Sequence, residues 1–412
     1  MKIIALTETE FDKFASNHKY RNFYQTSNYA KVMKVEGFES AYLGFYNNSN
    51  DLIGASLILH KKVWLNYKIA YAPFGFLIDY SNNDLIEEMT YKLKKLLLKQ
   101  RFIYLKINPL IHCAERKKNG DIISYNPEIN DILEILKRNH YRHHGFNKFF
   151  ENQKPRWTAI TKLTISNNKI YQLLSKQVRN KINKANRNGV DIYKATHEDL
   201  TILYEFIKRK QKKSINYYQA LLDAFQEKAE IYLAYINPEK YVRLSKAYYE
   251  QELEKNEAFN DTLQERTRKG QDVSKLINTK MESDKKLGIY QASLMKATTI
   301  FQEHPKGIII GGALIIKYTN GANLIIEGFD KNYQDYNPNY LLKWELIKKF
   351  NDENYQYFNL NGIVGEFNQK NKYSGLNEMK LGFNASAIEY IGEFDLIINK
   401  TVYNILHRNR II

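Results

Sequence analysis

The order of the predicted helices and strands indicates an α+β protein with two similar mixed-sheet domains and a long helical arm inserted in the second. Three observations predict this class. The chain has 412 residues, which is enough for two domains besides the arm. The order strand, strand, helix, strand occurs in each half, which is typical of a repeated fold. A polar stretch over 238–305, with apolar residues at helical spacing, interrupts the second half between two apolar strands.

Each element of the first half has its own local signal. A strand over 3–6 leads through the capping residue Thr7 into a helix over 8–17. Ser27 caps a helix over 28–36, which Gly37 ends. Strands, a helix and a further strand follow, separated by Asn-rich and Gly-containing turns: 40–46, 52–62, 67–72, 84–100 and 102–107.

The second half begins at Trp157 and shows a related order. Gly311 and Gly312 fall inside an apolar strand, where they indicate a bulge or close packing rather than a phosphate loop. The predicted elements before the arm are a strand over 158–165, helices over 169–188, 198–213 and 217–228, and a strand over 231–236. Those after the arm are strands over 308–317 and 322–328, a helix over 339–351 and a strand over 355–360.

The arm is predicted to be an antiparallel two-helix coiled coil. Leu287, Leu294 and Phe301 recur every seven residues, and the first half carries Tyr241, Leu244 and Tyr248 at similar spacing. A turn at 268–272 separates the two helices. A thin, charged arm on a globular body predicts a large partner.

The charge balance narrows the class of partner. The formal net charge is +17, which favours a polyanion: nucleic acid, an anionic membrane surface or a phosphorylated substrate. The single cysteine, Cys113, is compatible with a reducing compartment. Because the sequence has neither a signal-peptide pattern nor an apolar run of membrane-spanning length, we expect a cytoplasmic protein.

The clearest pattern of charged residues lies in the helix predicted over 169–188. No Asp or Glu occurs between Asn152 and Val190. Apolar residues share one side of the helix, and the basic residues share the other: Lys176, Arg179, Lys184 and Arg187. We expect the apolar side to pack and the basic side to meet a polyanion, although a solvated helix face is an equal alternative.

Common cofactor and metal signatures are absent from the sequence. The starts of the helices at 84 and 339 lack the glycine-rich loop that would hold a pyrophosphate, so we expect no cofactor. His140, His143 and His144 lie close together, but no cysteine or carboxylate accompanies them. We therefore expect surface histidines and no metal.

Several segments, in order and nearly from end to end, resemble the Fem family of peptidoglycan bridge-forming aminoacyltransferases. Segment 24–34 resembles the family's Q-x-x-x-W-A-x-x-K opening, with Tyr29 in place of Trp. Segment 71–80 is similar to its Y-x-x-R-G-x-x-x-D-Y motif, with Phe74 in place of Arg. The other matching segments are 179–190, 215–221, 303–307, 375–380 and 389–395.

The resemblance implies two N-acetyltransferase-like (GNAT) domains that use aminoacyl-tRNA in place of acyl-CoA. It places the first domain over 1–150, with 388–412 packing back on it, the second over 151–237 and 304–387, and the arm over 238–303. The implied acceptor is lipid II, met at the inner face of the membrane, and a homodimer or a family partner is a further expectation.

The resemblance also implies site residues. Lys380 is expected to lie near the chemistry, and Asp79 is the one candidate base or amine-orienting carboxylate. The remaining predicted site residues bind substrate, with Lys34 and Arg179 on the diphosphate of the precursor: Lys34, Tyr71, Arg179, Tyr217, Lys176 and Lys184. Two other functions stay open, a non-catalytic RNA-binding protein and an acyl-CoA N-acyltransferase.

Overall fold

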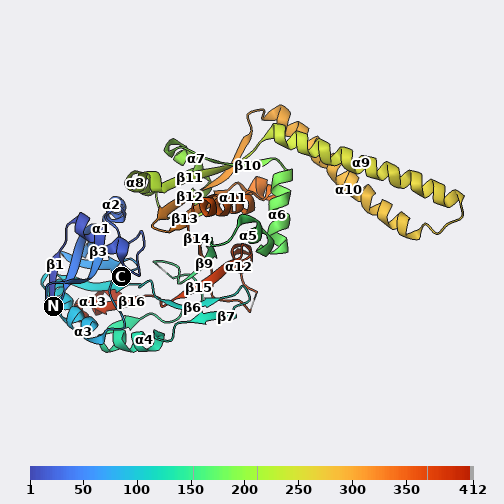
Figure 1. Cartoon of the computed structure of the whole chain (residues 1–412). Coiled ribbons are helices and arrows are strands. Elements are labelled where there is room, and N and C mark those ends of the chain that lie inside the picture. Colours follow the sequence, from blue (N-terminus) through green and yellow to red (C-terminus); the bar gives the residue numbers. More distant parts are fainter. Residues whose placement is uncertain (152, 211, 369, 409–412) are drawn as a thin grey trace.

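The computed structural model describes residues 1–151, 153–210, 212–368 and 370–408, and within these it contains two mixed sheets (Figure 1). The predicted α+β class is confirmed. The predicted returning segment 388–412 extends past the described residues at its end. No helix in the described ranges is long and apolar enough to cross a membrane.

The first sheet belongs mainly to the N-terminal part of the chain. Its strand order is β1-β2-β3-β4-β5-β16-β8, and only β4 and β5 pair in parallel. The strands are β1 Lys2–Ala5, β2 Glu39–Tyr46, β3 Leu52–Trp64, β4 Tyr67–Ala72, β5 Phe102–Ile107, β8 Tyr141–His143 and β16 Phe394–Ile397. The helices of this part are α1 Glu8–Asn17, α2 Ser27–Val35, α3 Asn83–Lys99, α4 Ile129–Arg138 and the C-terminal α13 Lys400–Arg408.

The second sheet has the order β10-β11-β12-β13-β14-β9-β15-β6-β7, and β13 and β14 are its parallel pair. Its strands are β6 His112–Arg116, β7 Ile122–Tyr125, β9 Trp157–Lys162, β10 Val190–Lys194, β11 Ala229–Ile236, β12 Ile308–Tyr318, β13 Gly321–Phe329, β14 Tyr357–Gly362 and β15 Ala385–Tyr390. Its helices are α5 Asn167–Leu173, α6 Lys176–Arg187, α7 Leu200–Ile207, α8 Ile215–Phe225, α11 Pro338–Asp352 and α12 Ser374–Leu381.

The two sheets exchange strands. β6 and β7 come from the first 150 residues, yet they pair beside β15 in the second sheet, whereas β16 from the C-terminal part pairs in the first. The sheets therefore do not follow the predicted boundary at 150 in this region, and the domain limits remain a proposal.

Helices cover both faces of the second sheet, and the alternation along β11 shows which helix lies on which face. Tyr232 and Ala234 belong to the core beneath α6 and α11. Ile231 and Leu233 point the other way, into the core beneath α7 and α8. α6 and α8 therefore lie on opposite faces of the same sheet.

The helix predicted over 169–188 is two helices. Ser175 has an extended backbone, and its hydroxyl accepts a hydrogen bond from the Val178 amide, which makes it the cap of a new helix, α6. α5 ends at Leu173. The predicted bulge at the glycines is present, since the β11–β12 register shifts beside Gly311, and a Cβ at Gly311 would lie 2.2 Å from the Phe329 ring.

The arm consists of two long helices, α9 Pro238–Arg268 and α10 Ser274–Glu303, which run side by side away from the body (Figure 1). Asn237 caps α9, and Pro238 occupies its first turn. The predicted apolar seam is wrong in part. Phe301 is exposed, while Ala297 and Ile300 are buried against the body.

Farther out, polar pairs fill the seam of the arm. The Asn256 amide donates to Asp284 (2.8 Å), and the Ser283 hydroxyl donates to Glu252 (2.8 Å). The sequence spacing located the helices but missed these polar contacts, because small and polar residues occupy seam positions that a heptad pattern assigns to Leu or Ile.

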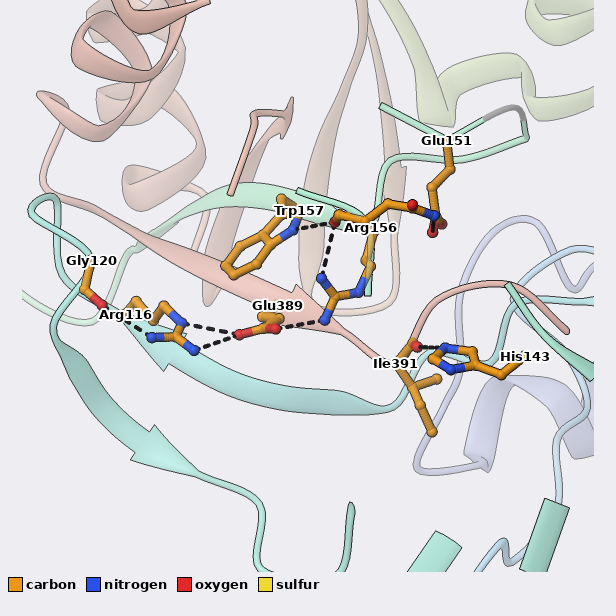
Figure 2. Close-up of polar contacts among 9 residues, drawn as sticks. Arg116, Gly120, His143, Glu151, Arg156, Trp157, Glu389 and Ile391 are labelled. Atoms are coloured by element: carbon orange, nitrogen blue, oxygen red, sulfur yellow. Dashed lines mark hydrogen bonds and ion pairs between the residues drawn. The ribbon is translucent and has the colours of Figure 1, made fainter. Parts of the chain in front are cut away.

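A buried ion-pair cluster joins the segment before β9 to the strands β15 and β6 (Figure 2). Glu389 accepts hydrogen bonds from Arg156 (2.5 Å) and from Arg116 (3.0 Å). The side chain of Arg156 is 1% exposed and also donates to the Asn147 carbonyl. This cluster holds the beginning of β9 against β15 and β6 in the second sheet.

We predict that Glu389→Gln lowers the free energy of unfolding by about 3 kcal/mol, because it leaves the Arg156 guanidinium buried without a carboxylate. Denaturant unfolding measures the loss. The matched control is Glu250→Gln, which breaks an exposed pair with Lys246 and should cost under about 1 kcal/mol. Equal losses in the two variants would contradict a structural role for the cluster.

Candidate active site

A cleft of about 480 Å³ lies between the first-domain loops and one face of the second sheet. First-domain residues on one wall include Lys19, Arg21, Tyr24 and Phe74. The facing wall is made of side chains from β9, β13, β14 and β15, among them Thr158, Lys162, Asn323, Tyr357, Asn359 and Tyr390. Hydroxyl, amide and basic groups dominate this lining, which suits a polar, anionic ligand.

An aromatic cluster closes one end of the cleft. Tyr29 on α2 lies close to Tyr217 on α8, and each side chain affects the pKa of the other. The ring of Tyr29 packs edge-on against Tyr24, which in turn contacts Phe74. Burial raises the pKa of Tyr217 to about 12, and it raises the pKa of Tyr29 well above its usual range. These hydroxyls therefore stay protonated and act as hydrogen-bond donors at neutral pH.

Tyr71 lies at the end of β4 beside the same cluster. Its hydroxyl donates to Asn108 (3.1 Å), and the same Asn108 oxygen accepts from the Phe74 amide (2.9 Å). Tyr71 and Tyr217 thus both lie close to the aromatic cluster that contains Tyr24, while their role in binding substrate stays a prediction. Phe74, which replaces an expected Arg, contributes a ring there instead of a charge.

Two lysines that the sequence analysis missed bring positive charge to this cluster. The ammonium of Lys154 lies 3.8 Å from the ring centre of Tyr24, and that of Lys213 lies 4.9 Å from the ring centre of Tyr217. Burial, and then the charge of Lys213, lower the pKa of Lys154 to about 7. Lys213 also donates to Glu36 (2.5 Å). Two cations with few compensating carboxylates favour an anion here.

Lys34 is exposed on the last turn of α2, two residues before Glu36. Glu36 at the end of this helix pairs with Lys213. The role of Lys34 in substrate binding stays a prediction.

Asp79 lies apart from this cluster. It is exposed, and it accepts hydrogen bonds from the Ser81 hydroxyl (2.8 Å) and from Lys19 (3.4 Å). Partial burial raises the pKa of Asp79, but the hydrogen bonds from Ser81 and the charge of Lys19 outweigh it and hold the pKa below its usual value. No contact among the described residues joins Asp79 to Lys380, and its geometry is that of a turn cap.

Lys380 is buried on α12. Its ammonium donates to the Gly362 carbonyl (2.9 Å), at a bulge that ends β14. Burial lowers the pKa of Lys380 to about 8, Glu327 acts in the opposite direction, and Lys343 lowers it further. The amine is therefore mostly charged at neutral pH, and it loses its proton only slightly above neutral pH.

Glu327 and Lys343 form an ion pair beside Lys380. Lys343 comes from the buried face of α11, its side chain is 0% exposed, and it also contacts the Asn339 carbonyl. Together the two lysines and one carboxylate carry a net charge of +1 in a region with little water. Such a cluster favours a negative charge that develops nearby.

The parallel pairing of β13 and β14 ends early and makes room for this cluster. The two strands pair only from Gly321 to Asn323 on β13. Beyond that point a side chain replaces the backbone pairing: the side-chain amide of Asn361 donates to the Ile325 carbonyl (3.1 Å). Asn323 and Asn359, where pairing ends, line the cleft, and Lys380 binds the last residue of β14. The strand β14 thus contributes Asn359 to the cleft and, three residues later, Gly362 to the buried Lys380.

The basic residues of α6 lie elsewhere. Lys176 and Lys184 are exposed on the α6 side of the second sheet. Arg179 donates to the carbonyls of Gln172 (2.6 Å) and Leu174 (3.0 Å). Since α8 covers the other face, the predicted grouping of Arg179 with Lys34 around one diphosphate is wrong.

No cluster of metal-ligating side chains occurs among the residues described. The predicted surface placement is wrong for His143, which is half-buried: its ring stacks on Phe394 and its Nε2 is hydrogen-bonded to the Ile391 carbonyl (2.9 Å). His144 forms an ion pair with Asp395 (2.9 Å).

The missed residues carried different sequence signals. Lys343 and Glu327 each interrupt an apolar pattern, one on a helix face and one on a strand, and such a charge indicates a buried ion pair. Lys154 and Lys213 lie in irregular segments, where the sequence gives no indication of which way a side chain points.

The comparisons with known proteins agree with this architecture. A model of the FemAB family matches residues 6–408. Aminoacyltransferase FemA of Staphylococcus epidermidis is 26% identical over 421 residues, covering 98% of each chain. Aminoacyltransferase FemA of Staphylococcus aureus is 25% identical over 412 residues, covering 98% of this chain and 97% of that protein.

A crystal structure of FemX has the same fold. It is 20% identical in sequence, has a TM-score of 0.74, and the match covers 98% of this chain and 100% of FemX. The family model spans nearly the whole chain, including both sheets and the arm. This chain belongs to the FemAB family.

Proposed function

We propose that this protein transfers an amino acid (glycine, serine or alanine) from aminoacyl-tRNA to the stem-peptide amine of lipid II, which builds the peptidoglycan interpeptide bridge. Its class is that of an aminoacyltransferase, as in the FemA relatives that match it from end to end. The protein would act in the cytoplasm and contact the membrane from its inner side to reach the lipid-linked acceptor. A homodimer or a family partner is a further proposal.

The observation that carries the proposal is the position of Lys380. Its buried ammonium binds Gly362 at the end of β14, three residues beyond Asn359, which lines the polar cleft. In acyl transfer, the amine nitrogen attacks the ester carbonyl, the C–N bond forms, and the C–O bond to the ribose breaks. Negative charge develops on the carbonyl oxygen during attack.

Lys380 is suited to stabilise that oxygen. An ammonium has three N–H donors, and the Gly362 carbonyl takes one of them, so two remain for substrate. The proton released by the attacking amine passes to the ribose oxygen that leaves. We assign no protein base to this transfer, because Asp79 lies outside the cluster. Alignment of two activated substrates supplies much of the rate.

The cleft and the aromatic cluster suit the acceptor. Lys154 lies over the rings of Tyr24 and Tyr29, and Lys213 lies over the ring of Tyr217. A diphosphate would accept hydrogen bonds from such ammonium and hydroxyl groups. The hydroxyls and amides farther along the cleft match a sugar and a peptide.

The proposal is tested by incubating the purified protein with lipid II and tRNA charged with glycine, serine or alanine. Mass spectrometry of the lipid should show a gain equal to one aminoacyl residue. If no charged tRNA produces a gain while S. aureus FemA and its own substrates give one in the same assay, the proposed function is wrong.

We predict that Lys380→Met lowers kcat by about 100-fold or more, because an oxyanion donor is lost, while precursor binding stays within about two-fold. Single-turnover kinetics measure the first quantity and calorimetry the second. A variant that retains kcat but loses precursor binding would contradict the role of Lys380.

The transfer rate should fall as pH rises through about 8, because Lys380 loses its charge there. Glu327 raises the pKa of Lys380, so Glu327→Gln should move this falling limb to lower pH. The matched control is Glu345→Gln, which breaks a half-exposed pair on α11 and should leave the limb in place. Thermal unfolding checks that both variants are folded. If the fall of the transfer rate in Glu327→Gln occurred at the same pH or at a higher pH, Lys380 would not be the group that titrates.

We predict that Lys213→Ala weakens precursor binding about ten-fold, the cost of one charged hydrogen bond. Arg179→Ala should leave precursor binding unchanged, because Arg179 lies on the opposite face of the sheet. Calorimetry with the soluble UDP-linked precursor measures both. If Arg179→Ala weakened precursor binding and Lys213→Ala did not, the diphosphate would bind at α6 instead.

A further inference from the structure

A groove runs along the exposed side of α6, where the base of the arm approaches it. Two adjoining hollows of about 480 and 840 Å³ make up the groove, and they share Lys184, Arg187 and Tyr248. It lies on the α6 face of the second sheet, and its residues differ from those of the cleft between the domains.

Gly189 allows the arm to come this close to α6. Its φ of +72° is left-handed, and a Cβ there would lie 2.5 Å from the Tyr241 side chain and 2.8 Å from the Asn237 carbonyl. The Asn237 amide donates to the Gly189 carbonyl (2.8 Å), which fixes the start of α9 against the end of α6. The groove is thus a built feature of the fold rather than a chance gap.

The groove is strongly basic. Its lining has five basic side chains: Lys181, Lys184, Arg187, Lys286 and Lys296. Asp335 is the one carboxylate among the described residues that line it. Four asparagines of the α6 segment add hydrogen-bond donors and acceptors: Asn180, Asn183, Asn186 and Asn188. Such a lining matches a row of phosphates better than a single one.

Aromatic rings accompany the charges. The guanidinium of Arg187 lies 5.8 Å from the ring centre of Tyr248, whose ring contacts Tyr290 across the arm. The ammonium of Lys296 lies 4.6 Å from the ring centre of Tyr336. Basic side chains interleaved with aromatic rings are typical of surfaces that bind nucleic acid backbones and unstacked bases.

The groove also points toward Lys380. At the other end of α6, the Ser175 amide donates to the Gly382 carbonyl (2.9 Å), two residues after Lys380. Lys184 and Lys176 are eight residues apart, which is about 12 Å along a helix. Three or four stacked nucleotides, at about 3.4 Å each, span this length.

We infer that the groove between α6 and the base of the arm binds the phosphate backbone of the donor RNA next to its single-stranded 3′ end. This inference rests on the proposed function, and it assigns the recognition of RNA to five basic residues of the groove, three on α6 and two on α10. RNA then reaches Lys380 from the α6 face, while the lipid-linked acceptor reaches it from the cleft on the other side.

The test measures the binding of an uncharged, 5′-fluorescein-labelled tRNA to the full-length protein by anisotropy, at several salt concentrations. Lys184→Glu/Arg187→Glu reverses two charges in the groove, and Lys184→Gln/Arg187→Gln removes them without adding repulsion. The matched control is Lys117→Glu/Lys118→Glu, in the exposed turn between β6 and β7, at the opposite edge of the second sheet from β10.

Both groove variants should bind tRNA at least ten-fold more weakly, and the slope of log affinity against log salt should fall by about 1.4 to 1.8 for two lost phosphate contacts. The control and precursor binding should not change. Unchanged tRNA affinity in both groove variants would overturn the inference, as would weaker binding of precursor or of anionic phosphatidylglycerol vesicles in place of tRNA.

A parallel transfer assay separates this inference from the proposed function. If the wild-type protein transfers an amino acid and the groove variants transfer it with the same kcat/KM, the inference fails and the function stands. If the wild-type protein binds tRNA through the groove yet transfers nothing, the function fails and the groove remains an RNA site.

Discussion

The early end of the β13–β14 pairing is the constraint on which the active site depends. Beyond Asn323 the strand β13 no longer pairs with β14, and in this part of the fold Glu327 of β13 pairs with Lys343 of α11, close to Lys380 of α12. Burial of three charges is costly unless they pair, and here one carboxylate serves two lysines. Burial is the main cause of the lowered pKa of Lys380, and Lys343 lowers it further. The unbalanced positive charge suits the cluster to face a developing oxyanion. The same unbalanced charge thus costs stability and supports the reaction.

A second feature of the structure is the division of the second sheet into two faces. The alternation along β11 assigns α6 and α11 to one face of the second sheet and α7 and α8 to the other. Each face has its own basic surface, one at the aromatic cluster and one at the α6 groove. Under the proposed function, the two large anionic substrates would therefore not compete for one entrance, and they would meet at the opening between the strands. The arm contributes to this arrangement through its base.

Much of this architecture follows from the sequence. Apolar strands, capped helices and the polar arm predicted the class and the order of elements, because these signals are local. The position of Lys380 beside the chemistry came from a resemblance, and the geometry is compatible with it. Pairing across the chain was not predictable in the same way: β6 and β7 joined the second sheet, and Arg179 fell on the face opposite Tyr217. Faces of a sheet depend on register and on crossovers, which a helical wheel or a motif does not contain. Lys154 and Lys213 were missed for a related reason, since their direction depends on irregular backbone.

In the proposed reaction, a charged Lys380 faces the carbonyl oxygen on which negative charge develops. The most direct measurement is the affinity, as a function of pH, for a phosphoramidate analogue in which a tetrahedral, anionic phosphorus joins the ribose oxygen of a tRNA 3′ end to the acceptor amine nitrogen. Calorimetry should show tight binding below pH 8, a loss of about ten-fold per pH unit above it, and no such dependence in Lys380→Met. An affinity that is the same in both proteins at every pH would contradict the account.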